Sequence, residues 1–310
     1  MSGSVLSDVP GPRAVARNRV LGVVTILVVA GIVGFFVWRL AETGQFTAQK
    51  WSAFTYTNVW IQIGQATGRT LAAFVVAAIG ALVLGFVLAI GRLSDHAWVR
   101  MPFTAVIEVL RAVPVLVFMF LLYYGLPAAG IRMEPYWAVV IALIAYNGSV
   151  LAEVFRAGVE SLPSGQREAG YAIGLRKSGV MRLILLPQAV RAMMPVIIAQ
   201  LVVTLKDTAL GYIITYEELL FYARYIGSQA ALGSPIVPAT IVVALIYIGL
   251  CLLLSLVATV VERRLRRSSR GGPVAGANQP MQEVTDTELI VTQRARGRNG
   301  DRDLDGAASA

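Results

Sequence analysis

Long apolar runs separated by short polar segments make up most of the chain. Each run is about 20 residues long, which is enough for a helix to cross about 30 Å of hydrocarbon. The runs predict about six membrane-spanning helices, at residues 20–38, 70–91, 102–126, 135–155, 188–214 and 236–261. The pattern therefore predicts an all-α, polytopic membrane protein.

The segments around these runs carry further local signals. Residues 39–68 form a polar loop whose end, 59–68, is interpreted as an interfacial helix. Pro195 and the polar residues Lys206 and Asp207 are expected to break up the fifth span. The first run is long for the apolar part of a signal peptide, and no small-residue cleavage pattern follows it. It is therefore interpreted as a retained helix.

Charge then fixes an expected orientation. Only 15% of residues are charged, and the formal net charge is +9. The cations gather before the first span, after the second, after the fourth and after the sixth. With six spans these four groups fall on one side, which the positive-inside rule assigns to the cytoplasm. Both termini are then cytoplasmic, and the positive charge needs no nucleic-acid partner.

Two other features limit the chemistry that the chain can perform. Its one cysteine, Cys251, lies in an apolar run, and its one histidine, His96, lies in a polar loop, so neither a disulfide nor a metal site is expected. No Gly-x4-Gly-Lys-Ser/Thr loop is present for binding nucleotide phosphates. We therefore expect no catalytic residues and no cofactor in this chain.

Residues 263–310 form a basic tail. It contains much Gly, Ala, Arg and Asp and almost no aromatic residues. Such a composition buries too little apolar surface to offset the entropy of ordering, so the tail is predicted to be disordered. Its first residues, within ERRLRR, are expected to lie against anionic lipid headgroups.

A polar segment, residues 163–188, interrupts the apolar chain. Good helix formers from Gln166 to Ile173 predict a short helix, and Gly174 is placed to end it in the left-handed conformation. A second short helix is expected from Ser178 to Leu185, with Pro187 ending it or opening the next. Small residues on the first helix would let another surface approach closely. The segment is either an amphipathic connector on the membrane or a docking helix for a cytoplasmic partner.

Ionisable and polar residues inside the predicted spans are costly in lipid and usually face protein or a cavity. Glu108 and Arg111 are three residues apart and are interpreted as a structural ion pair. The remaining candidates either pair internally or line a pathway that meets a zwitterionic amino acid. They are Asn147, Glu153, Arg156, Lys206 and Asp207.

The spacing within the polar segment carries a resemblance. Glu168, Ala169 and Gly170 are followed by Gly174 and then by Ile-Leu-Leu-Pro ending at Pro187. This order resembles the EAA signature of permease subunits of ATP-binding-cassette importers, except that Gly170 stands where the family usually has Ala. Glycine keeps the position small and weakens a helix by about 1 kcal/mol.

Three further runs resemble those of the polar amino-acid permeases in this family. They are RAVPVLVFMFLLYYGLP at 111–127, AYNGSVLAEVFRAGVESLPSGQREAG at 145–170 and LPQAVRAMMPVIIAQLVVTLKDTAL at 186–210. The resemblance covers roughly residues 70–262, and an added helix near the N-terminus is similar to glutamate-type permeases.

The resemblance implies a type I importer permease fold with one added N-terminal helix. It divides the chain into a cytoplasmic segment 1–19, the added helix 20–38, an extracytoplasmic loop 39–68, a permease core 69–262 containing the coupling loop 158–186, and the tail 263–310. Glu168, Ala169, Gly170, Gly174 and Pro187 would form the site that couples to an ATPase.

The resemblance also implies a set of partners. Two ATPase subunits would bind ATP and magnesium, so that this chain is not itself an enzyme. A second permease chain, identical or related, would complete the pathway, and an extracytoplasmic binding protein would deliver a polar amino acid, with glutamate the most plausible. The complex would lie in the plasma membrane of a bacterium, surrounded by lipid.

Two other functions remain as alternatives. The chain could be an ion-driven secondary amino-acid carrier or channel that uses Lys206 and Asp207, although it shows no inverted hydropathy repeat. It could also be a membrane scaffold that recruits a soluble partner without transport. The carrier reading leaves the EAA spacing unexplained.

Overall fold

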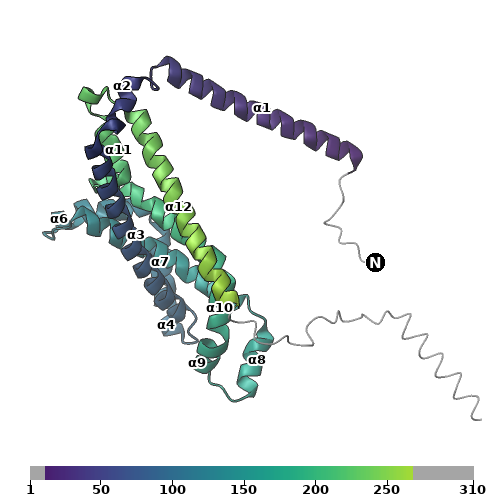
Figure 1. The fold of residues 1–310 in the computed structure, drawn as a ribbon. Helices are drawn as coiled ribbons and strands as arrows, with labels where there is room; N and C mark the ends of the chain where they lie inside the picture. The colour runs from purple at the N-terminus through teal and green to yellow at the C-terminus, as the bar shows by residue number, and fades with distance from the viewer. Residues whose placement is uncertain (1–10, 268–310) are drawn as a thin grey trace, which may run out of the picture. The chain divides into compact units, whose positions relative to one another are not determined.

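The computed structural model describes residues 11–267, and within that part every regular element is helical (Figure 1). The helices are α1 (Pro12–Glu42), α2 (Ala48–Trp51), α3 (Thr57–Arg92), α4 (Ala97–Ala112), α5 (Val115–Phe120), α6 (Leu126–Ala128), α7 (Pro135–Glu160), α8 (Ser164–Ala172), α9 (Lys177–Gly179), α10 (Leu186–Asp207), α11 (Leu219–Gly227) and α12 (Ile236–Arg267). Five stretches are long and apolar enough to cross a membrane, and α4 with α5–α6 adds a sixth if that bent pair is one span. The prediction of an all-α protein with about six spans is confirmed.

Short 3-10 and π-helical segments lie between or within these helices. They are η1 (Ser52–Thr55), η2 (Leu121–Gly125), η3 (Val180–Leu185), η4 (Thr208–Ile214) and η5 (Ala230–Leu232). Two of them, η2 and η3, are π-helical, and each lies just before a proline, Pro127 or Pro187. Because a proline inside a helix removes one hydrogen bond and crowds the preceding turn, the wider π turn accommodates its ring.

Three predicted boundaries are wrong. The expected interfacial helix at 59–68 and the span at 70–91 are one helix, α3, because no proline interrupts residues 57–92. Pro195 lies inside α10, which continues to Asp207 without the expected break. The helix expected at 178–185 begins at Lys177 without a Ser178 cap and continues through η3 into α10.

The span expected at 102–126 is sharply bent. α4 ends at Ala112 and α5 begins at Val115, and the segment Val115–Ala128 is bent by 93° from α4. Val113 has an extended backbone conformation, with φ −87° and ψ 122°. A proline disfavours the helical conformation of the residue before it, so Pro114 accounts for the extended Val113 and for the bend.

Helices α3 and α7 cross along a seam of small residues. On α3 a buried small residue recurs every fourth position, at Ala73, Ala77, Ala81, Gly85 and Ala89. Small residues at this spacing let two helix backbones approach closely, as in membrane helix pairs generally. A Cβ atom on Gly85 would lie 2.9 Å from the carbonyl oxygen of Gly148 and 3.2 Å from the backbone nitrogen of Ala152. The position therefore requires glycine.

Replacing Gly85 with Ala should destabilise the protein, because backbone atoms of α7 cannot move aside for a methyl group. We expect a loss of about 1–2 kcal/mol, typical of overpacking, seen as a lower thermal unfolding midpoint in detergent. Gly64→Ala is the matched control on the same helix, since nothing lies within 4 Å of its added Cβ. Equal midpoints for the two variants would contradict the close α3–α7 crossing.

At its other end α3 packs against α11 and α12. A buried cluster joins Val59, Ile63 and Ala66 of α3 to side chains of these two helices, and they include Leu219, Tyr222, Ile226, Ala239 and Val243. The region predicted as an added span, 20–38, lies within α1, whose apolar stretch is exposed throughout. Most of the predicted tail, residues 268–310, lies outside the described residues.

Candidate functional site

The polar segment folds as a helix, a glycine turn and a second helix. α8 spans Ser164–Ala172, and Gly174 follows in the left-handed conformation with φ +80°. The backbone N–H of Gly174 donates to the carbonyl oxygen of Tyr171 at 2.9 Å, and that of Leu175 donates to Gly170 at 3.1 Å. These bonds close the end of α8, and they confirm the predicted helix with its glycine stop.

The two faces of α8 differ. Glu168 and Ala169 are exposed, and within the described residues the Glu168 carboxylate has no hydrogen-bond or ion-pair partner. Gly170 is buried, about 200° around the helix from Glu168. Pro187 is exposed at the start of α10. The outer face of α8 is thus free to contact another molecule, while its inner face holds the segment together.

Gly170 allows α8 to lie close against η3. A Cβ atom at this position would lie 2.8 Å from Cγ2 of Val180 and 3.0 Å from Cδ1 of Ile184. Val180 is itself buried. The glycine therefore leaves room for a β-branched neighbour on η3.

Replacing Gly170 with Ala should loosen this packing, because Val180 is stiff at χ1 and cannot rotate away freely. We expect a cost of about 1–2 kcal/mol and faster limited proteolysis of the loop that follows α8. The additional substitution Val180→Ala should restore resistance, so that the two changes are strongly non-additive. If the Gly170→Ala protein is cleaved at the wild-type rate, close packing against Val180 is not the reason for a glycine at this position.

Apolar and ionic contacts anchor the segment to the rest of the chain. Val180, Leu185 and Ala189 pack with Val159 at the end of α7. Lys177 forms an ion pair with Asp95, in the turn after α3, and its Nζ donates to the carbonyl oxygen of Leu93 at 3.2 Å. The hydrogen bond from Lys177 lowers the pKa of the Asp95 carboxyl below its ordinary value. Movement of α8 and η3 must therefore also involve the ends of α3 and α7.

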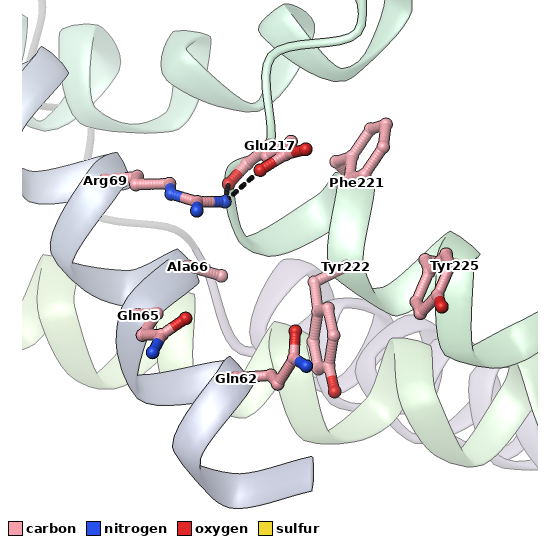
Figure 2. Close-up of a pocket in the computed structure, with 8 residues that line it drawn as sticks. All are labelled: Gln62, Gln65, Ala66, Arg69, Glu217, Phe221, Tyr222 and Tyr225. Carbon is pink, nitrogen blue, oxygen red and sulfur yellow. Dashed lines mark hydrogen bonds and ion pairs between the residues drawn. The ribbon is translucent and has the colours of Figure 1, made fainter. Parts of the chain in front are cut away.

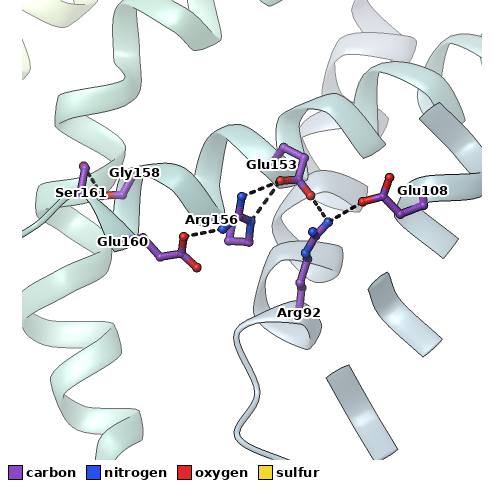
Figure 3. Close-up of polar contacts among 7 residues, drawn as sticks. All are labelled: Arg92, Glu108, Glu153, Arg156, Gly158, Glu160 and Ser161. Carbon is purple, nitrogen blue, oxygen red and sulfur yellow. Dashed lines mark hydrogen bonds and ion pairs between the residues drawn. The ribbon is translucent and has the colours of Figure 1, made fainter. Parts of the chain in front are cut away.

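An ionic cluster lies at these same helix ends (Figure 3). Arg92 of α3 pairs with Glu153 of α7 and, at 3.4 Å, with Glu108 of α4. Arg156 pairs with Glu153 at 3.0 Å and with Glu160. The cluster thus joins three helices through two guanidinium groups and three carboxylates.

The cluster corrects one predicted ion pair and clarifies another. Glu108 is paired with Arg92 rather than with Arg111, because the tertiary fold brings the end of α3 beside α4. Glu153 and Arg156, candidates for the pathway, are bound to each other and to neighbouring charges. Sequence reasoning missed Arg92, whose position at a span end made it look like an ordinary loop cation.

The other pathway candidates lie apart from this cluster. Asn147 is buried in α7, and its Oδ1 accepts a 2.7 Å hydrogen bond from Nε2 of Gln200 on α10. Lys206 is exposed and borders a cleft of about 490 Å³ beside α12, and Asp207 is half-buried. No ion pair joins Lys206 to Asp207 in the part of the chain that the structure describes. Gln200, another residue that the sequence did not single out, links α7 to the helix that continues from the polar segment.

No metal centre is suggested by these groups. Among residues 11–267 no set of three or more His, Cys, Asp or Glu side chains is arranged to hold a metal ion.

Comparisons with known proteins agree with the fold. Residues 81–267 match the family model described as binding-protein-dependent transport system inner membrane component. The chain is 40% identical over 231 residues to the glutamate transport system permease protein GluD of Corynebacterium glutamicum, covering 73% of this chain and 84% of that protein. It is 33% identical over 200 residues to the probable glutamine ABC transporter permease protein GlnM of Bacillus subtilis, covering 64% of this chain and 91% of that protein.

A solved structure shows the same fold. The crystal structure of an amino acid ABC transporter with histidines matches with a TM-score of 0.61 and 28% identity, over 69% of this chain and 97% of that one. The inward-facing MetNI methionine ABC transporter matches with a TM-score of 0.57 at 16% identity, over 68% of this chain and 99% of that one, which shows likeness of fold alone.

Proposed function

The chain belongs to the family of inner membrane components of binding-protein-dependent transport systems, and on that premise we propose that it forms the membrane pathway of an ATP-driven importer for a polar amino acid of the glutamate type. The observation that carries the coupling part of this proposal is the exposed, partner-free face of α8 on a firmly anchored segment. The permease names of its relatives support the substrate class, and GluD supports glutamate within it. It is a transport subunit and not an enzyme.

Coupling in this proposal runs through the polar segment. An ATPase subunit would dock on the outer face of α8, contacting Glu168 and Ala169, with Gly170 and Gly174 setting the shape of the segment. From Lys177 the chain is helical without a break to Asp207. Because Gln200 on this helix hydrogen-bonds Asn147 on α7, a displacement of α8 and η3 would reach a polar contact deep between two spans. Such a rigid-body switch is the expected response to nucleotide-driven closure of the ATPases.

The proposed importer function implies a set of partners. We propose a pair of ATPase subunits that bind ATP and magnesium, a second permease chain and an extracytoplasmic binding protein, with lipid around the spans. The positive-inside pattern supports cytoplasmic termini and, with them, a position of α8 on the side where the ATPase subunits would bind. Specificity would rest largely with the binding protein, because the buried polar groups between α7 and α10 are few.

ATP-driven uptake tests the proposal directly. Proteoliposomes would contain the chain with its co-purifying ATPase and permease subunits, and the binding protein would be added outside. We expect uptake of labelled L-glutamate that requires internal ATP and persists when ion gradients are collapsed. Uptake that continues without ATP and stops with an ionophore would support the ion-driven carrier instead. Preference for glutamine, arginine or cystine over glutamate would revise the substrate and leave the importer function intact.

A further inference from the structure

A polar cleft lies between α3 and α11 (Figure 2). It is nearer the N-terminal end of α3, whereas the ionic cluster lies at the C-terminal end. The volume of the cleft is about 270 Å³. One wall carries Gln62, Gln65 and Arg69 of α3, which share a helix face because they are three, four and seven positions apart. The facing wall carries Glu217, Tyr222 and Tyr225. None of these residues belongs to the coupling route proposed above. The polar and charged side chains that line the cleft distinguish it from an apolar gap between packed helices.

Arg69 and Glu217 form an ion pair inside this cleft. Their side chains remain 47% and 57% exposed, so each keeps free hydrogen-bonding groups beside the pair. An exposed pair of this kind contributes little to stability, about 0–1 kcal/mol. Arg69 and Glu217 can therefore give up their mutual contact and bind a ligand instead, at little cost to the stability of the fold.

A rigid frame holds the pair in place. The Tyr216 hydroxyl donates to the carbonyl oxygen of Arg69 at 2.7 Å, and the backbone N–H of Leu219 donates to Oγ1 of Thr70 at 3.2 Å. Glu218 caps α11 and accepts a 2.6 Å hydrogen bond from the Tyr247 hydroxyl of α12. Burial raises the pKa of the Glu218 carboxyl to about 7. The residues on both sides of Glu217 are thus fixed, while its own carboxylate faces the cleft.

The other lining groups suit a small polar molecule. Within the described residues the amides of Gln62 and Gln65 have no hydrogen-bond partner, and each amide offers a donor and an acceptor. The rings of Tyr222 and Tyr225 lie nearly parallel, with centroids 6.1 Å apart. A ligand with one charge would leave one member of the ion pair uncompensated. A zwitterion supplies a partner to both.

We propose that this cleft binds a free α-amino acid with a polar side chain. Arg69 binds the α-carboxylate, Glu217 binds the α-ammonium, and Gln62 and Gln65 hydrogen-bond the side chain. The site holds the amino acid near the mouth of the membrane domain, outside the contact between Asn147 and Gln200. This inference rests on the proposed import function and on its orientation, which places the N-terminal end of α3 outside the cytoplasm.

A cysteine-protection experiment on the reconstituted complex tests the site locally. Cys251→Ser removes the chain's only thiol, and Tyr225→Cys then places a reporter in the exposed wall of the cleft without removing any of the four proposed ligand groups. With L-glutamate at about ten times its Kd, labelling by a membrane-impermeant maleimide should slow about tenfold, because the site is then about nine-tenths occupied. Ile61→Cys, which is exposed on a neighbouring face, is the matched control and should label at an unchanged rate.

Further variants separate ligand binding from folding. Arg69→Gln or Glu217→Gln in the reporter chain should abolish protection and leave the labelling rate without ligand unchanged. Arg39→Gln, which breaks the exposed pair with Glu42 on α1, should keep full protection. Protection that survives Arg69→Gln, or that appears only with the binding protein and no free amino acid, would overturn the proposal. ATP-driven uptake by the Cys251→Ser chain is measured in the same proteoliposomes. If that chain imports glutamate but the ligand does not protect the reporter cysteine, the proposed site is wrong and the proposed import function stands.

Discussion

Replacing Glu168 with Lys should abolish amino-acid uptake while the chain still inserts and folds. The Glu168 carboxylate is exposed on the outer face of α8 and has no partner among the described residues. The substitution therefore removes no internal contact, and its effect must come from another molecule. The new lysine on α8 would repel any cation of the ATPase that the Glu168 carboxylate attracts. Like-charge contacts in an interface cost several kcal/mol. Uptake in proteoliposomes and co-purification of the ATPase are the two measurements.

Two controls make this prediction specific. Glu134→Lys makes the same charge change at an exposed residue just before α7, at the end of that helix farther along the chain from α8, and it should leave uptake and co-purification unchanged. The thermal unfolding midpoint of Glu168→Lys should equal that of the wild type. Normal uptake by Glu168→Lys would remove α8 from the coupling route. Lost uptake with a lowered midpoint would show that Glu168 serves the fold.

Local chemistry explains which features of the polar segment could be predicted. The helix α8 and its stop at Gly174 depend on residues within a few positions of one another, and both appear as predicted. The small-residue character of Gly170 was also visible in the sequence. Its reason was not, because Val180 and Ile184 come into contact with it only after the chain has turned at Gly174.

The wrong helix boundaries have different physical origins. Pro114 bends the third span, whereas Pro102 and Pro195 lie inside helices. A proline alone therefore does not decide whether a membrane helix breaks, since neighbouring helices and π turns can satisfy the backbone groups that it frees. The repeat of small residues from Ala73 to Ala89 on α3 was a usable signal for the α3–α7 crossing.

The ionic pairs could not be predicted from spacing alone. The i,i+3 rule places Glu108 near Arg111, but it cannot weigh a cation from another helix, and Arg92 lies 16 positions away. The same limit applies to Arg69 and Glu217, which are 148 positions apart. Charges near the ends of spans thus select their partners through the tertiary fold.

Replacing Arg92 with Met should produce the largest loss of stability among the single substitutions considered. Arg92 and Glu153 are only 19% and 17% exposed at their side chains. Without Arg92, Glu108 would lose its partner in the cluster, and Glu153 and Glu160 would share one cation, Arg156. Glu153 would keep only one of its two cations, and breaking a largely buried ion pair costs about 3 kcal/mol, so the thermal unfolding midpoint in detergent should fall markedly. The ends of α3, α4 and α7 would loosen together, and uptake should fall with them.

A second substitution and a matched control test the electrostatic cause. Glu153→Gln added to Arg92→Met removes the excess negative charge while keeping a side chain of the same shape, and it should recover much of the lost midpoint. Arg39→Met breaks an ion pair whose side chains are 60% and 49% exposed, and it should cost only about 0–1 kcal/mol. Equal effects of Arg92→Met and Arg39→Met would mean that the cluster contributes no more than a surface pair. Failure of Glu153→Gln to recover stability would assign the loss to the packing of the Arg92 side chain instead of its charge.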